Sequence, residues 1–540
     1  MRSDGGSDIK SRDLSDALAK WVFVAFVVVA APLILFRLGR FHWFFSDDWF
    51  FLVEGRVGSA KDLFQPHNAH WTTLPFIEYR MLWHVAGLKS YLPYQAVLIG
   101  VHLSVVAALR AIALRIGVRP WIATAMAGAL VLFGPGADDI VWAIEITFTA
   151  AAAFGLAQLL LTDHGGPFDR RDVIALVAGL FAIMCSGVGV AMVIIVGIAV
   201  LLRRGWKIAA VQTLPIAIVY LTYQFIEHPQ VESPLGRPRI GVVWRWLVDA
   251  EISIFEGLGR YAAVEIALVV LLILGFSLAW FAPATPGTLA ERRRRLAMPT
   301  ALLIGGVVFS AITVQGRWQF GPNEARASRY VYLGAAFTLP ALAVAAEELA
   351  RRRRELVVVG IGLLIIAIPA NAAGFDNSVF NRAYFDQQRR VILTAPRVPF
   401  ADQLPPALQP LVNPFIPPRL DMGFLLQAQK EGRLPSAPRP LSASTVDEYR
   451  VRLGLAQEAT AVAPTACHDE AGPLFADPKI GGTLRFTTPV AISLVDGNRA
   501  TPVLHYLPRN GQLLVVQLAD LHLRLAPSGS ARSFTMCDPP

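Results

Sequence analysis

Long apolar runs alternate with short polar clusters along the first 373 residues of this chain. A transmembrane helix needs about 20 apolar residues to cross a hydrocarbon core of about 30 Å, and each run has roughly that length. The pattern therefore predicts an α-helical polytopic membrane protein with about eleven transmembrane helices. The predicted helices cover approximately residues 21–38, 91–109, a run ending at "GPGADD", 140–162, a hairpin at 173–202 that breaks at "CSGVG", 208–226, 261–281, 299–314, 331–349 and 355–373.

Basic residues cluster in the turns on one side of this predicted membrane path. The strings "RAIALRIGVRP", "DRRD", "RRGWK", "ERRRR" and "RRRR" all fall on the side of the N-terminus, which the positive-inside rule makes cytoplasmic. We expect a cytoplasmic tail at 1–20 and a membrane domain at 21–373 with a long outer loop at 39–90. A second outer loop contains "RPRIGVVWRW", and everything from residue 374 onward lies outside.

The extracytoplasmic region divides into a proline-rich linker at 374–445, expected to wrap a surface, and a β-rich module at 446–540. The stretches "GGTLRFTT", "VAISLVD", "PVLHYLP", "QLLVVQLA" and "LHLRLA" alternate as strands do, and the turn signals "DGN" and "RNG" separate some of them. Cys467 and Cys537 flank these strands and can pair if the region faces an oxidising compartment, although spacing alone does not give their geometry. Cys185 falls in an apolar run and is expected in the core.

Composition supports the membrane interpretation. Only 16% of the 540 residues are charged, against roughly 25% in an average soluble domain. The net charge of +9 comes mostly from the clusters in the cytoplasmic turns, so no nucleic-acid partner is expected. The first apolar run lacks a small-residue cleavage site and is interpreted as a retained anchor.

An acidic pair stands near the start of the first outer loop, in "FHWFFSDDWFFL". Asp47 and Asp48 lie among aromatic residues at an expected membrane border. One interpretation is that they cap a helix "DWFFLVEG", with "SDD" as its N-terminal signal. The other is that a carboxylate serves the chemistry of a site. Both can hold, because a cap engages one carboxylate and leaves its neighbour for another role.

The same loop offers weaker candidates. His67 and His70 in "QPHNAHW" can bind a metal ion or a phosphate, but the spacing lacks a stronger metal pattern. Glu78 and His84 follow in a stretch that, like "DDWFFLVEGRV", is expected to form an amphipathic interfacial helix. A solvated loop that anchors the interface explains all four residues equally simply. The sequence specifies no cofactor, and a divalent metal ion stays open.

A second acidic group lies at the outer turn before the 140–162 helix. Asp138 and Asp139 stand in the turn, and Glu145 lies slightly inside the membrane. Ionisable residues in an apolar span are costly and mark functional sites. The alternative is an ordinary helix start with an acidic first turn.

Three outer arginines depart from the inside-positive bias. Arg317, Arg326 and Arg329 lie before the 331–349 helix, with Trp318 and Tyr330 among them. Guanidinium groups bind phosphate bidentately, and interfacial aromatic rings can flank a lipid chain or stack on a sugar. Salt bridges to Asp47 or Asp138 are the structural alternative.

These motifs together resemble the polytopic glycosyltransferases of the GT-C class. "FFSDDWF" is similar in kind and place to the acidic motif in the first outer loop of that class. "ASRYVYLGA" is similar to an Arg-Tyr stretch that opens a late helix in several members, and the hairpin broken at "CSGVG" is similar to their short mid-chain helix pair. The resemblance covers roughly residues 20–350. The "WWD" signature of oligosaccharyltransferases is absent.

The resemblance implies transfer of a sugar from a polyprenyl-phosphate donor to an extracytoplasmic glycan, lipid or protein acceptor, with inversion. Asp47 or Asp48 would act as base, while Arg329, Arg326, Arg317 and Tyr330 would hold the donor phosphate. A transporter or flippase, or a polymerase or ligase, for lipid-linked glycans is the alternative. A transporter should have midplane ionisable groups or repeated halves, and neither is evident. Ala- and Arg-rich usage indicates a bacterial cytoplasmic (inner) membrane.

Overall fold

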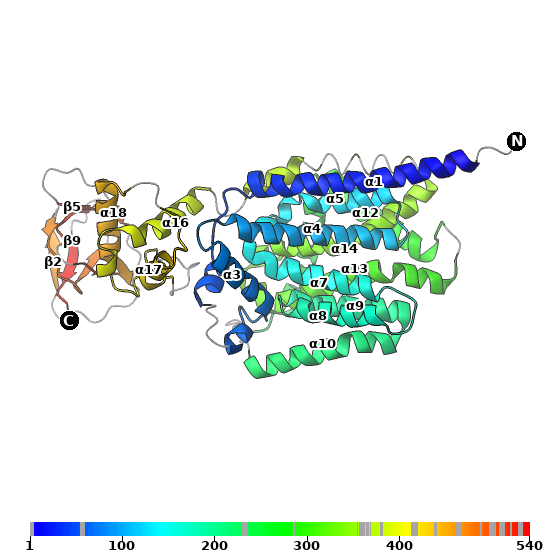
Figure 1. Ribbon diagram of the computed structural model, residues 1–540, viewed down its shortest axis with the longest axis horizontal. Coiled ribbons are helices and arrows are strands. Elements are labelled where there is room, and N and C mark those ends of the chain that lie inside the picture. Colours follow the sequence, from blue (N-terminus) through cyan, green and yellow to red (C-terminus); the bar gives the residue numbers. More distant parts are fainter. Residues whose placement is uncertain are drawn as a thin grey trace. The chain divides into compact units, whose positions relative to one another are not determined.

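The chain forms helices over most of its length and strands near its C-terminus (Figure 1). It divides into two compact units, which we describe separately. The helical unit comprises Met1–His42, Val57–Tyr79 and Leu92–Asn381, and the mixed unit comprises Trp43–Arg56, Arg80–Tyr91 and Arg382–Pro540. The computed structural model describes residues 5–54, 60–228, 236–284, 287–353, 355, 362, 367, 369–377, 382–411, 420–436, 440–458, 467–471, 474–486, 489–495, 504–506, 513–518, 521–527 and 533–539.

Seven stretches among the described residues are long and apolar enough to cross a membrane. This identifies a multi-pass membrane protein, as the apolar runs predict. The helices that supply these stretches are α1 (Gly5–Leu33), α4 (Leu92–Arg115), α7 (Ile146–Thr162), α10 (Trp206–Glu227), α12 (Ala262–Phe281), α13 (Leu289–Arg317) and α14 (Ser328–Arg352).

Shorter helices stand where further spans are predicted. The apolar helix α5 (Pro120–Val131) ends before the turn "GPGADD". The predicted hairpin is α8 (Arg170–Ile183) and α9 (Val188–Arg204), separated at "CSGVG". A capping box at Asp169 and Asp172 starts α8. The predicted span 355–373 lies largely outside the described residues, so a total near eleven stays a prediction.

The core of the helical unit surrounds α14. Every side chain from Tyr330 to Ala345 is buried, and α14 packs against α12, α13 and α5. Figure 1 shows α4, α7 and α14 running alongside one another in this unit. A helix buried on all sides needs apolar or small residues around its whole circumference, which the sequence of α14 supplies.

The basic clusters meet at one end of the helical unit. Arg203 at the end of α9 donates to the carbonyl of Arg294 near the start of α13 (3.2 Å). Arg351 at the end of α14 donates to the carbonyl of Gly117, just after α4 (3.2 Å). The opposite end of the same helices carries the start of α14 and of α7, where the candidate acids and arginines lie.

One region differs from its predicted form. The outer segment containing "RPRIGVVWRW" is interpreted as a loop from the sequence, but it forms the 20-residue helix α11 (Ile240–Gly259). Its buried residues, Trp246, Ala250, Ile254 and Leu258 among them, recur every three or four positions, while charged residues stand between them. Arg245, Asp249 and Glu256 obscure this helical period in a linear search for apolar runs.

Two sheets form the C-terminal part of the mixed unit. One has the order β1-β7-β4-β9-β2 and the other β3-β8-β5-β6, with antiparallel neighbours throughout. The strands predicted at "GGTLRFTT", "VAISLVD", "PVLHYLP", "QLLVVQLA" and "LHLRLA" are confirmed as β4 to β8; the "DGN" and "RNG" turns lie outside the described residues. The strands are β1 (Leu455–Glu458), β2 (Cys467–Ala471), β3 (Leu474–Ala476), β4 (Thr483–Phe486), β5 (Val490–Leu494), β6 (Leu504–Tyr506), β7 (Leu513–Val516), β8 (Leu523–Pro527) and β9 (Ser533–Cys537).

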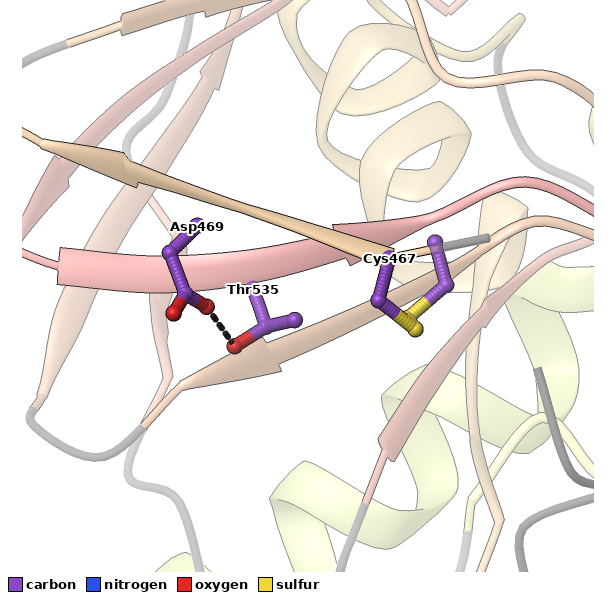
Figure 2. The surroundings of a disulfide bond; sticks show 4 residues. Cys467, Asp469 and Thr535 are labelled. Carbon is purple, nitrogen blue, oxygen red and sulfur yellow. Dashed lines mark hydrogen bonds between the residues drawn. A yellow bond between two sulfur atoms is a disulfide. The ribbon is translucent and has the colours of Figure 1, made fainter. Parts of the chain in front are cut away.

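A disulfide between Cys467 and Cys537 is confirmed. The two residues are paired in register on the neighbouring strands β2 and β9, and Figure 2 shows the bond beside the hydrogen bond from the Thr535 hydroxyl to Asp469 (2.6 Å). Disulfides persist in oxidising compartments, so this bond is consistent with an extracytoplasmic location of the C-terminal region.

Helices also occur where the linker is predicted. α16 (Arg382–Thr394) and α17 (Met422–Lys430) precede α18 (Ala443–Gly454). Residues such as Val398, Met422 and Tyr449 join strand residues such as Ile492 and Leu525 in one hydrophobic core. From Arg382 onward, the described part of this segment therefore belongs to the same folded body as the sheets, whereas residues 374–377 belong to the helical unit.

Candidate functional site

The first acidic pair opens a short helix in the mixed unit. Asp47 and Asp48 are the first residues of α2 (Asp47–Trp49), which continues as η2 (Phe50–Glu54). Ser46, just before them, has φ 48°, a left-handed conformation that a non-glycine residue adopts at a cost of roughly 1–3 kcal/mol. Such strain persists only where the surrounding structure holds the turn in place.

Hydrogen bonds explain how this turn is held. Asp48 is fully buried, and its Oδ2 accepts the backbone N–H of Phe45 (2.9 Å) and the hydroxyl of Tyr91 (3.2 Å). Asp47 is only half-buried. In its bond to Phe45, the Asp48 carboxylate therefore does not cap a backbone N–H of α2; it accepts the N–H of a residue before the helix and closes the preceding turn, and the N-cap residue Ser46 makes no side-chain capping bond.

Aromatic rings pack around the same turn. Trp43 and Trp49 meet edge to face with centroids 5.4 Å apart, and Phe44 meets Tyr91 at 4.8 Å. Such pairs contribute beyond their buried area. The aromatic residues of "FHWFFSDDWFF" thus fix the Asp47 backbone rather than standing only as membrane anchors.

The second acidic pair opens a short helix in the helical unit. Asp138 and Asp139 begin α6 (Asp138–Val141), and the Asp138 N–H donates to the hydroxyl of Ser328 at the start of α14 (3.1 Å). Asp139 is fully buried, and neither oxygen of its carboxyl group has a hydrogen-bond partner within the described chain. Among the described residues, this pair therefore differs from the first in that its inner carboxyl group accepts no hydrogen bond.

An ion pair lies beside this carboxyl group. Arg329 Nη1 stands 3.3 Å from Glu145 Oε1, and Glu145 is almost completely buried. Burial raises the pKa of Asp139 well above its usual 3.8; Glu145 and Asp138 raise it further, and Arg329 opposes them. Burial likewise raises the pKa of Asp138, again against Arg329. Asp139 thus holds a proton more readily than an ordinary aspartic acid.

His67 and His70 face each other across a two-residue turn. Their backbones exchange both hydrogen bonds (3.0 and 2.8 Å), and the residues between them, Asn68 and Ala69, have φ of 47° and 65°. Positive φ at both central positions is the feature of a type I′ turn, in which Asn is favoured at the first. The spacing of three in the sequence thus comes from a tight hairpin.

This hairpin lies against the gap between α8 and α9. A side chain at Gly187 would come within 3.0 Å of the His70 ring, so glycine permits the approach. The ring also meets Phe148 of α7 edge to face at 6.5 Å. Burial, with the nearby charges of Arg317 and His67, lowers the pKa of His70 to about 4. His70 is therefore neutral at physiological pH.

The outer arginines take different places. Arg317 ends α13 and lies close enough to His70 and to Tyr330 to interact with both electrostatically. Arg326 instead pairs with Glu256 of α11 (2.5 Å), on a partly exposed surface. Within the described part of the helical unit, none of these arginines forms the predicted salt bridge to Asp138; Arg329 pairs with Glu145 and Arg326 with Glu256 instead.

The helical unit thus brings together five of the predicted site residues at one end of its bundle, with Arg317 and the histidine hairpin nearby: Asp138, Asp139, Glu145, Arg329 and Tyr330. Glu78 is half-buried on α3 (Thr73–Val85). Asp47 and Asp48 belong to the other unit, and their convergence with the arginines stays a prediction.

Two partners were not predicted. Tyr91 donates a hydrogen bond to Asp48, which lies 43 positions away in the sequence, and a local sequence pattern does not predict such a contact. Ser328 precedes the Arg-Tyr stretch, and its place at the start of a helix beside a predicted arginine was a signal that could have been used.

A candidate group of metal-binding side chains lies elsewhere in the described part of the chain. Within the described residues, a group of three metal-binding side chains occurs at His164, Asp169 and Asp172. Asp172 there accepts two hydrogen bonds from Arg204 (2.5 and 3.0 Å), so a guanidinium group already occupies the position of a cation. A divalent ion at His67 and His70 stays a prediction.

Comparison with protein-family models, with curated proteins and with solved structures gives no match for this chain. The chain is a multi-pass, mainly helical membrane protein whose C-terminal region is a small β-rich body with a disulfide.

Proposed function

We propose that this protein is a membrane glycosyltransferase of the GT-C type, which moves a sugar from a polyprenyl-phosphate donor to an extracytoplasmic acceptor. The observation that carries the proposal is the cluster at the end of the helical unit opposite the basic clusters. There Arg329 pairs with a buried glutamate next to the buried carboxyl group of Asp139, which accepts no hydrogen bond from the described residues. Under the positive-inside rule this end faces outward, where a lipid-linked donor would present its phosphate.

Arg329 is the group best suited to the donor phosphate. A guanidinium group can bind phosphate in bidentate fashion. The side chain of Arg329 is 28% exposed despite its ion pair. Arg317 adds a second positive charge near Tyr330. Arg326 is engaged by Glu256, so we assign it no part in the transfer itself.

Asp47 is the proposed base. Asp48 already accepts hydrogen bonds from Phe45 and Tyr91, so it positions the turn, whereas half-buried Asp47 is more accessible. In the reaction, Asp47 takes the proton of the acceptor hydroxyl as that oxygen bonds to the anomeric carbon. The bond from that carbon to the phosphate oxygen breaks, and its electron pair leaves with the phosphate, next to Arg329. A single displacement inverts the anomeric centre.

The proposal includes the topology expected from the sequence: about eleven spans, a cytoplasmic N-terminus, an extracytoplasmic C-terminal region, and a bacterial cytoplasmic membrane. The acceptor is a cell-envelope glycan, a glycolipid or a protein. A polymerase or ligase for lipid-linked glycans would share the donor chemistry and differ in its acceptor.

The test is to incubate the purified protein with a panel of polyprenyl-phosphate sugars and to measure release of the polyprenyl phosphate. We expect at least one donor to lose its sugar, and the Asp47→Asn/Asp48→Asn double variant to be inactive. Asp402→Asn, at an exposed aspartate in η10 (Ala401–Gln403), is the matched control. A protein that moves these lipids between leaflets with the sugar still attached would instead be a transporter.

A further inference from the structure

A polar pocket of about 400 Å³ lies between two helices of the mixed unit. α16 contributes Asp386, Gln387 and Arg390, and α18 contributes Glu448 and Arg452. Ligand sites in proteins commonly enclose roughly 300–1,000 Å³, so the pocket has room for a small organic group. Its lining includes neither of the acidic pairs described above.

Helix periodicity explains why these polar side chains face the same space. On α16, residues 383, 386, 387 and 390 share one face, because three or four positions make about one turn. The other face of α16, which includes Phe385 and Ile392, is buried. On α18, Glu448 and Arg452 are also four positions apart, with Arg452 Nη2 at 3.5 Å from Glu448 Oε1.

The two walls are joined by a direct bond. The hydroxyl of buried Tyr449 on α18 donates to the backbone carbonyl of Arg390 on α16 (3.1 Å). Ser442 caps the start of α18, and its hydroxyl accepts the N–H of Thr445 (3.2 Å). Tyr449 also belongs to the hydrophobic core beneath the helices. The two helices that carry the lining residues are therefore held together by this hydrogen bond and by the core.

The chemistry of the lining selects a neutral ligand with many hydroxyl groups. The lining holds two carboxylates, Asp386 and Glu448, and two guanidinium groups, Arg390 and Arg452, so its formal charges sum to zero. Carboxylate oxygens accept hydrogen bonds, while guanidinium and amide groups donate them. A sugar hydroxyl does both, and planar carboxylate, amide and guanidinium groups can bind two neighbouring hydroxyls at once.

Several of these groups are available for a ligand. Neither the guanidinium of Arg390 nor the amide of Gln387 has a hydrogen-bond or ion-pair partner within the part of the chain that the structure describes. Among the same residues, Asp386 pairs with Arg382, at 3.3 Å on an exposed surface. Exposed pairs of this kind contribute little and exchange readily with another partner.

From this pocket we infer a binding site for one end of a neutral oligosaccharide, within the glycan part of the acceptor. The inference rests on the proposed function for the identity of that glycan as an acceptor, whereas the sugar-binding property follows from the pocket alone. The site would retain an acceptor chain on the extracytoplasmic region and so favour acceptors that already carry several sugars.

The experiment uses the full-length protein in detergent and measures binding of neutral tetrasaccharides by calorimetry, with arabino-, manno- and gluco-oligosaccharides as probes. Inorganic phosphate and a lysine-rich tetrapeptide test the anionic and cationic alternatives. We expect at least one tetrasaccharide to bind, and both Arg390→Ala and Gln387→Ala to weaken it roughly tenfold or more, because each removes hydrogen bonds to the ligand.

Arg389→Ala is the matched control, since Arg389 is an exposed neighbour on α16 that does not line the pocket. It should bind the sugar as the unchanged protein does, and all three variants should unfold at the same temperature. Three results would overturn the inference: no tetrasaccharide binds, the pocket variants bind as tightly as the control, or phosphate or the peptide binds in place of sugar.

Failure of the proposed function would look different. In that case no polyprenyl-phosphate sugar is cleaved by the unchanged protein, while tetrasaccharide binding and its dependence on Arg390 persist. Conversely, a protein that cleaves the donor but shows no sugar binding at Arg390 and Gln387 would retain the proposed function and lose only the acceptor site.

Discussion

Two Asp-Asp pairs each form the first two residues of a short helix, but their buried carboxyl groups have different hydrogen-bond partners. Both open a short helix, α2 or α6, and in both the second aspartate is fully buried. Asp48 accepts hydrogen bonds from Phe45 and Tyr91. Asp139 accepts none from the described residues and lies near Glu145 and Arg329.

The difference shows how the same dipeptide can be used in two ways. Where the buried carboxylate is satisfied, it stabilises the turn and its half-buried neighbour can take part in chemistry, which is the role we propose for Asp47. Where the buried carboxyl group is unsatisfied, burial and neighbouring acids favour its protonated form. Asp139 would then limit the negative charge beside Arg329, so that Arg329 keeps more attraction for a phosphate.

The sharpest separation within the first pair comes from single substitutions. We expect Asp47→Asn to lower the rate of sugar transfer by about 10²- to 10⁴-fold, because it removes the base. Asp48→Asn should reduce transfer less, since its role is to hold the turn. Rates of polyprenyl-phosphate release measure both effects. If Asp48→Asn folds and is the less active of the two variants, Asp48 rather than Asp47 is the base.

Substitution of Arg329 tests the group that lies beside the second acidic pair. Arg329→Gln should slow transfer by about 10²- to 10³-fold, because it removes a preorganised positive charge from the leaving phosphate. Arg245→Gln is the matched control, at an exposed arginine of α11. Equal transfer by both variants would remove Arg329 from the mechanism.

Stability should distinguish the two buried carboxyl groups. Asp48→Ala is expected to cost roughly 1–3 kcal/mol of unfolding free energy, because the Phe45 N–H and the Tyr91 hydroxyl lose their acceptor. A double-mutant cycle with Tyr91→Phe, followed by thermal unfolding in detergent, isolates the side-chain bond. An absence of coupling between the two positions would show that this hydrogen bond does not stabilise the turn.

The smallest expected effect is a pH dependence at Asp139. A carboxyl group whose pKa is raised by folding adds stability that is complete below its unfolded pKa and is lost as pH rises through the folded pKa. Burial and neighbouring acids raise the pKa of Asp139. We therefore expect the unfolding temperature of Asp139→Asn, minus that of the unchanged protein, to increase as the pH rises from about 5 to about 8. A constant or shrinking difference over that range would mean that Asp139 is ionised in the folded protein.

Periodicity in the sequence was sufficient for the elements with one dominant pattern. The long apolar runs and the alternating strands "VAISLVD" and "LHLRLA" were recognised because each follows a single period. α11 was missed because Arg245, Asp249 and Glu256 interrupt its apolar face. The helices of the 374–445 segment were missed because its proline content outweighed the amphipathic period of α16.

Site residues were harder to rank than to find. The sequence singled out both Asp-Asp pairs, but the contact that separates them, Tyr91 with Asp48, spans distant positions. Likewise, the sequence alone does not distinguish the three outer arginines. Only the fold shows that Arg326 forms an ion pair with Glu256 and that Arg329 forms one with Glu145. Burial and partner choice are properties of the fold, so composition and spacing cannot supply them.

The most direct test of the proposed chemistry is a structure of the protein with polyprenyl phosphate bound, determined by electron cryomicroscopy. We predict that the phosphate oxygens lie within hydrogen-bond reach of the Arg329 guanidinium and that the Asp47 carboxylate stands beside the position of the missing sugar. A phosphate bound away from Arg329, or Asp47 on the opposite side of the membrane from it, would contradict the proposal.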